Sequence, residues 1–120
     1  MGIEVTDRKV RLLHIKTLAV YLIQLLLPLR NNDKQKFPTE LFESVRHELL
    51  DRFGGVTAFV RSPAVGLWKE SDEVERDEVV MFEVLAANLE ADWWAGYRKK
   101  LEDRFRQDEV LVWGTRIKKL

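Results

Sequence analysis

One acidic residue stands inside an apolar run and is the strongest candidate for chemistry in this sequence. Glu83 lies between Phe82 and Val84, where an ionised carboxylate is costly unless it is paired. If its side chain faces a pocket, it could serve there as a general base. The alternative is a structural ion pair with Arg61 or Arg116, which we expect on the edge strands of a sheet.

Two arginines and two tryptophans complete the candidate ligand-binding set. Arg61 and Arg116 could hold a carboxylate or a phosphate, because a guanidinium offers paired N–H donors; the alternative is that both are solvated charges. Trp68 and Trp113 could form rigid apolar walls of a pocket, or they could simply pack in the interior. The candidate site is therefore Glu83, Arg61, Trp68, Trp113 and Arg116, and no catalytic residue is nominated.

Other kinds of chemistry lack the residues they need. The chain has no cysteine and only two histidines, so we expect no disulfide, no thiol nucleophile and no metal site. Gly54-Gly55 follows a predicted helix, whose C-terminal end is negative, whereas phosphates bind at N-terminal ends. Neither a G-x-G-x-x-G nor a Walker pattern is present. We expect no cofactor, and the sequence leaves open whether the protein is an enzyme.

The charge balance argues against polyanionic partners. Twenty Lys and Arg residues balance twenty Asp and Glu residues, for a formal net charge of zero, so no overall field attracts nucleic acid or an anionic membrane.

The apolar run 17–29 follows basic residues, as in a secretory signal. It is shorter than the roughly 20 residues of a membrane helix and no small-residue cleavage site follows it. We interpret it as a buried strand and expect a cytoplasmic protein.

Two segments have the apolar periodicity of helices that pack against a sheet. Their apolar residues are Phe42, Val45, Leu49 and Phe53 in the first, and Trp94, Tyr97, Leu101 and Phe105 in the second. Pro38 suits the first turn of the first helix, and Gly54 suits its end, because the residue after a helix often takes a left-handed conformation. The second helix is expected to begin near Asn88, a favoured N-cap residue.

The predicted order of elements is strand, helix, strand, strand, helix, strand. The strands are expected at 18–27, 56–61, 78–85 and 109–117. This order is typical of the α+β ferredoxin-like fold, in which two helices cover one face of a four-stranded antiparallel sheet. The first and third strands are central in that topology, and here they are the most apolar. We expect one domain over 18–120, preceded by an extension, 1–17, whose order the sequence leaves open.

The other face of this sheet needs a partner. Neighbouring side chains of a strand point to opposite faces of the sheet. Met81, Leu85, Trp113 and the three consecutive leucines at 25–27 therefore cannot all face the helices. The simplest partner is a second copy of the chain, packed sheet to sheet in a homodimer. The rival is residues 3–16, folded back over the sheet.

Two classes of function remain open on this basis. A dimeric small-molecule-binding protein or small enzyme would hold its ligand between the sheet face and the linker 62–76, because such long connections are uncommon unless they are functional or disordered. A homo-oligomeric interaction module without catalytic activity would use the same face for assembly alone. A pocket lined by Glu83, an arginine and Trp68 or Trp113 would support the first class, and a face filled by a partner's side chains would support the second.

Several short motifs are spread along 18–120. They are Phe37-Pro38, Phe53-Gly54-Gly55-Val56-Thr57-Ala58, Gly66-Leu67-Trp68, Arg76-Asp77, Trp93-Trp94, Leu101-Glu102 and Phe105-Arg106-Gln107. Together they resemble a family of small uncharacterised bacterial proteins of ferredoxin-like type. The resemblance implies the fold and a bacterial origin, and that family offers no established catalytic residues to carry over.

Overall fold

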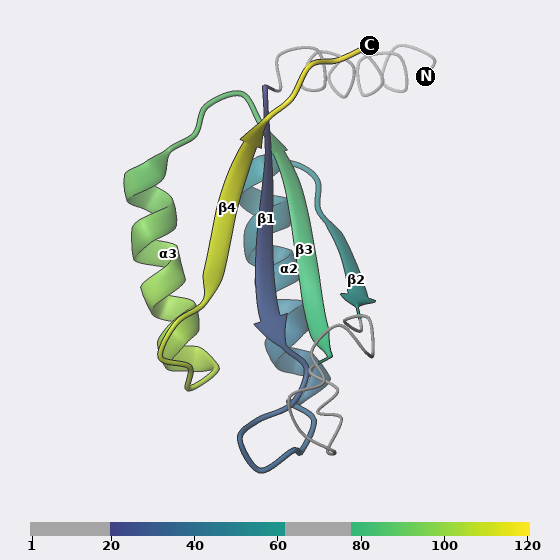
Figure 1. Cartoon of the computed structure of the whole chain (residues 1–120), viewed down its shortest axis with the longest axis vertical. Coiled ribbons are helices and arrows are strands. Elements are labelled where there is room, and N and C mark those ends of the chain that lie inside the picture. The colour runs from purple at the N-terminus through teal and green to yellow at the C-terminus, as the bar shows by residue number, and fades with distance from the viewer. Residues whose placement is uncertain (1–19, 62–77) are drawn as a thin grey trace, which may run out of the picture.

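The computed structural model of the chain describes residues 20–61 and 78–120. Its elements are β1 (Tyr21–Pro28), α2 (Thr39–Phe53), β2 (Thr57–Arg61), β3 (Val79–Ala86), α3 (Ala91–Arg104) and β4 (Leu111–Arg116) (Figure 1). The predicted order of strands and helices is confirmed, and with it the α+β ferredoxin-like fold.

The four strands form one antiparallel sheet in the order β2-β3-β1-β4. The two apolar strands β1 and β3 are central, as predicted. Gln24 of β1 lies opposite Glu83 of β3 on one side and opposite Trp113 of β4 on the other. Because directly opposite residues share a face of the sheet, this register decides which side chains can meet.

The core lies between the two helices and one face of the sheet. Every second residue of the central strands is buried on this face, as a period of two requires, and Met81 of β3 is buried on the opposite face as well. The core residues from the strands are Ile23, Leu25, Leu27, Val80, Phe82, Val84 and Ala86, and those from the helical side are Val45, Leu49, Trp94, Tyr97, Leu101 and Phe105, none more than 7% exposed. Figure 1 shows the sheet with α2 behind it.

Aromatic rings join the two helices above this core. The ring of Phe53, at the end of α2, stacks on Trp94 with 5.3 Å between centroids and meets Trp93 edge to face. Trp93 in turn stacks on Tyr97 at 4.8 Å. Trp94 is buried, whereas its neighbour Trp93 is only partly buried, which fits the turn of about 100° between successive helical residues.

The helix end at Gly54 is as predicted, but the start of α3 is not. Gly54 has φ 78°, and its N–H donates to the Leu50 carbonyl. α3 begins at Ala91, and Glu90 rather than Asn88 precedes it. Leu89 explains the delay, because its side chain lies over Gly114 of β4, 2.8 Å from where a Cβ atom would stand there.

The last strand is also shorter than predicted. It runs over Leu111–Arg116 rather than 109–117. The backbone N–H of Val110 donates to a carboxylate oxygen of Glu102 at 3.0 Å, so it is bound to a side chain of α3 rather than to a neighbouring strand. This contact between helix and strand start is tertiary, and local sequence preference does not reveal it.

Replacing Gly54 should test the left-handed helix end. Gly54→Ala is expected to lower the free energy of unfolding by about 1 kcal/mol, because a side chain is strained at this φ. Gly55→Ala is the matched control, since Gly55 is not among the residues with positive φ and a Cβ atom there meets nothing within 4 Å. Chemical denaturation measures both variants. Equal stability of the two would contradict the assignment.

Candidate functional site

The face of the sheet opposite the helices, called the second face below, carries one polar row of side chains between two mainly apolar rows. Across the strands, the first row is Phe59, Met81, Leu26 and Leu111, the polar row is Thr57, Glu83, Gln24 and Trp113, and the third row is Leu85, Leu22 and Thr115. Among the described side chains of these rows, Glu83 alone is charged. The second face is therefore a largely apolar surface with a polar centre.

Hydrogen bonds run along the polar row through Gln24. The indole Nε1–H of Trp113 donates to Oε1 of Gln24 at 2.7 Å, and Nε2 of Gln24 donates to a carboxylate oxygen of Glu83 at 2.6 Å. The same Nε2 lies 3.5 Å from the sulfur of Met81. An indole can only donate and a carboxylate can only accept, so a side chain with both functions must stand between them. Gln24 links three strands in this way.

The structure brings together two of the residues that the sequence nominated. Glu83 is half-buried and lies one hydrogen-bonded amide away from Trp113. The expected ion pair between Glu83 and Arg116 is absent from the described part of the chain. Arg116 is exposed and lies opposite Tyr21, an odd number of residues beyond Trp113, so it belongs to the other face of β4.

The other nominated residues lie at the end of a described segment or outside the described residues. Arg61 lies opposite Val79, toward the end of β2 and away from Thr57, which is opposite Glu83; its side chain lies outside the described residues. Trp68 and the linker 62–76 also lie outside them. The predicted pocket between the sheet face and the linker therefore stays a prediction.

Gln24 is the residue that sequence reasoning missed. It interrupts the apolar run of β1 as Glu83 interrupts that of β3. A single polar residue in each of two central strands was a usable signal, because such residues are costly unless they meet. The register that brings them opposite each other depends on the whole sheet.

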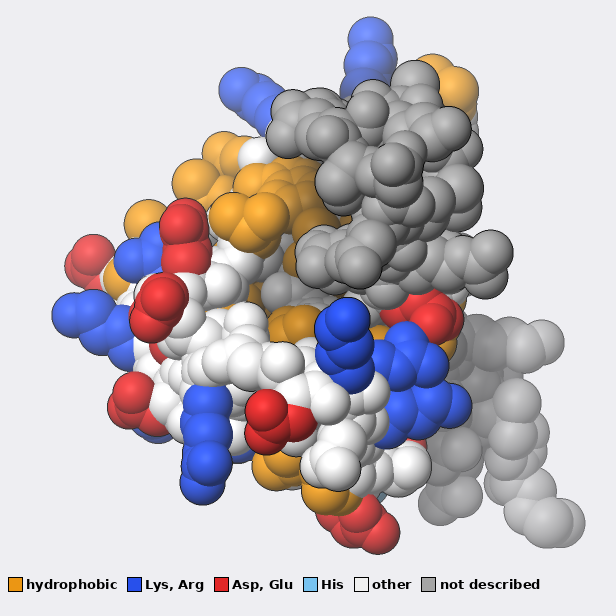
Figure 2. All heavy atoms as spheres, turned by 60° about the horizontal axis from the view of Figure 1, so that its bottom comes forward, with side chains coloured by type: hydrophobic (Ala, Val, Ile, Leu, Met, Phe, Trp, Pro, Cys, Tyr) orange, Lys and Arg blue, Asp and Glu red, His pale blue; other side chains and the backbone are white. Residues whose placement is uncertain are grey.

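Large apolar side chains on the second face remain exposed. Phe59 is 37% exposed, Leu111 52% and Trp113 39%. Figure 2 shows hydrophobic side chains gathered on the sheet side of the molecule, toward the top of the view. Met81, between Phe59 and Leu111 in the same row, is only 3% exposed, so the exposed side chains lie toward the two edges of the sheet, on β2 and β4. Apolar side chains exposed together on one face are typical of interaction surfaces and ligand sites.

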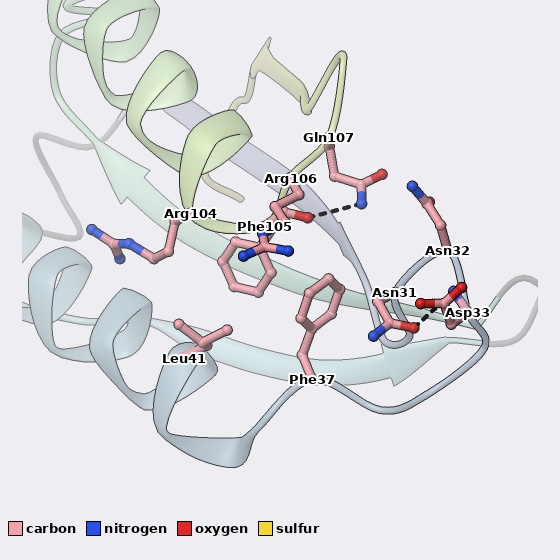
Figure 3. A pocket seen from close by; sticks show the side chains of 9 residues that line it. All are labelled: Asn31, Asn32, Asp33, Phe37, Leu41, Arg104, Phe105, Arg106 and Gln107. Atoms are coloured by element: carbon pink, nitrogen blue, oxygen red, sulfur yellow. Dashed lines mark hydrogen bonds between the residues drawn. The ribbon is translucent and has the colours of Figure 1, made fainter.

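A cavity of about 350 Å³ lies elsewhere, where the connection from β1 to α2 faces the turn after α3 (Figure 3). Arg104 at its edge is held by Glu48, whose two oxygens accept from the guanidinium at 2.6 and 3.0 Å. This hydrogen bonding raises the pKa of Arg104 and lowers that of Glu48. Burial, together with the charge of Glu48, raises the pKa of Tyr97, whose hydroxyl donates to the same carboxylate. These three side chains are already paired.

Metal-holding clusters and membrane-spanning helices are both absent from the described residues. No group of three or more His, Asp or Glu side chains within 20–61 and 78–120 could hold a metal ion. Neither of the described helices is long and apolar enough to cross a membrane.

Comparison with known proteins reveals the fold only. No family model and no curated protein sequence matches the chain. A phage SAM lyase in complex with S-methyl-5'-thioadenosine is similar in structure, with a TM-score of 0.57 and 15% identity over 82% of this chain and 81% of that one. CutA1 from Pyrococcus horikoshii has a TM-score of 0.48 and 16% identity over 83% of this chain and 85% of its own. At such low identity the similarity concerns architecture, not activity.

Replacing Gln24 by glutamate should test the polar row. Gln24→Glu keeps the acceptor for Trp113 but places two carboxylates side by side, so we expect a loss of about 2 kcal/mol in the free energy of unfolding at neutral pH. The loss should shrink in acid, where one carboxylate takes up a proton. Gln35→Glu adds the same charge at an exposed loop position and should change stability little. A Gln24→Glu variant as stable as this control would contradict the bridging role.

Proposed function

We propose that the chain is a homo-oligomeric domain that self-associates through the second face, in the simplest case as a homodimer. The observation that supports this is the exposure of Phe59, Leu111 and Trp113 on one side of the sheet. Both functions considered from the sequence, ligand binding and assembly, involve the same association. A two-fold axis would bring identical patches together, and an apolar patch is complementary to itself.

The polar row lowers the cost of burying this face. The indole N–H of Trp113 and the amide of Gln24 already have partners within the sheet, so a second copy need not supply them. A polar group that an interface buries without a hydrogen-bond partner lowers the affinity, because its desolvation is not compensated. Glu83 is the exception, because its charge also enters the interface.

Small-molecule binding at the second face is the further possibility. The observation that supports it is that Gln24 hydrogen-bonds to both Glu83 and Trp113. A ligand at this face could therefore contact an acidic group and an aromatic ring together. The ligand, the bacterial origin implied by the resemblance and the cytoplasmic location all remain proposals.

A charge on the second face should prevent association. Leu111→Arg is expected to convert a dimer into a monomer, because the introduced guanidinium would have to be buried. Light scattering at micromolar concentration should give twice the 14.1 kDa of the chain for the unaltered protein and the single mass for the variant. Leu50→Arg is the matched control: Leu50 is 38% exposed but lies on α2, so this variant should stay dimeric. A monomeric unaltered protein would overturn the proposal and favour residues 3–16 as the cover of the sheet.

Removing the charge of Glu83 should distinguish assembly from ligand binding. Glu83→Gln keeps an acceptor for Gln24, so the fold should be retained, and dimerisation should strengthen because no charge is buried. A dilution series by analytical ultracentrifugation measures this. Weaker association of the variant would show that the dimer needs the carboxylate. If a ligand of the second face is found, the same variant should lose it.

A further inference from the structure

The cavity at the end of β1 has a fixed apolar floor. Phe37 and Phe105 meet edge to face with 5.1 Å between centroids, and Phe42 supports Phe105 from the side at 5.3 Å. Phe105 is completely buried and supports Phe37, which is only partly buried, from the core side. Figure 3 shows the rings of Phe37 and Phe105 between the two walls of the cavity. A volume of about 350 Å³ lies within the range of small-molecule sites, although the lining is more polar than is usual for such sites.

The two walls carry polar groups of opposite charge. Asn31, Asn32 and Asp33 come from the connection between β1 and α2, and Arg106 and Gln107 come from the turn after α3 (Figure 3). The Asp33 loop is held in place by Asn31, whose Oδ1 accepts from two backbone N–H groups at 2.9 Å. The cavity therefore has an acidic wall and a basic wall that come from segments far apart in the sequence.

Arg106 is a cation without a partner among the described residues. Its neighbour Arg104 is neutralised by Glu48, but Arg106 makes no ion pair or side-chain hydrogen bond in the described part of the chain. The carboxylate of Asp33 is likewise unpaired there, and the two do not pair with each other across the cavity. Both residues are exposed, so water solvates their charges, and a ligand in the cavity could replace that water at both ends.

The backbone of Arg106 is strained. Its φ is 51°, and the bonds Gln107 N–H to Glu102 carbonyl and Arg106 N–H to Asp103 carbonyl, 2.8 and 3.3 Å, form a Schellman helix end. Glycine is the favoured residue at this left-handed position, and α2 indeed places Gly54 there. α3 places an arginine at the same position. Lys34 and Glu90 also have positive φ, of 63° and 40°; Arg106 is the one of the three that lines the cavity, and conformations of this kind are frequent at functional sites.

We propose that this cavity binds a small zwitterion with an apolar side chain, of which an α-amino acid is the simplest. Its carboxylate would accept from the guanidinium of Arg106, its ammonium group would donate to Asp33, and its side chain would lie against Phe37 and Leu41, the partly buried apolar residues of the lining. Charge-assisted hydrogen bonds at both ends would give selectivity, and these two side chains would give apolar contact. The site is separate from the second face and does not depend on self-association.

Three probes of the same shape test the proposal on the full chain. L-phenylalanine carries both charges, phenylacetate lacks the ammonium group and phenethylamine lacks the carboxylate. Isothermal titration calorimetry should show binding of L-phenylalanine at least about tenfold tighter than of either analogue. Equal binding of L-phenylalanine and phenylacetate would overturn the role of Asp33. Binding of none of the three would overturn the proposal.

Two variants separate a binding role of Arg106 from a structural one. Arg106→Gly should raise the melting temperature, because glycine suits the left-handed backbone. The same variant should lower the affinity for L-phenylalanine by about tenfold or more. A lower melting temperature or unchanged binding would overturn the proposal. Asp33→Asn should lower the affinity for L-phenylalanine but leave the affinity for phenylacetate unchanged. Arg46→Ala, which removes an exposed arginine of α2, is the charge control and should bind all three probes as the unaltered protein does.

Discussion

The hydrogen bonds of Gln24 are the constraint on which much of this structure depends. Gln24 joins β4, β1 and β3 on the second face, and the residues on either side of it, Ile23 and Leu25, are buried in the core. A slip of one residue in β1 would exchange these faces, placing the amide in the core and two large apolar side chains outside it. The register, the core and the composition of the second face are therefore held by the same pairing.

The fold could be predicted from the sequence because its signals are local. The apolar repeat of α2 ends at Gly54, and the mainly apolar composition of β1 and β3, each with a single polar residue at its centre, marks central strands. The start of α3 could not be predicted, since Asn88 is a good N-cap by type while Leu89 is drawn onto Gly114 by a tertiary contact. Element order follows from periodicity, but element ends depend on packing.

The candidate sites were harder to predict for the same reason. The polarity of Glu83 within an apolar strand was visible in the sequence, but its partner lies 59 residues earlier, and an arginine was expected instead. A carboxylate can be satisfied by a neutral amide as well as by a cation, and composition does not distinguish the two. The cavity beside Arg106 is formed by two connections that no sequence motif links, and the positive φ of Arg106 cannot be read from the sequence.

β1 leads directly from the polar row to the loop that carries Asn31, so one rigid strand belongs to both surfaces. Thermodynamic linkage applies to such an arrangement: if occupancy of the cavity alters the free energy of association, association must alter the affinity of the cavity by the same factor. Any such coupling would make the affinity of the cavity depend on protein concentration, because dilution and ligand would both shift the equilibrium between monomer and oligomer.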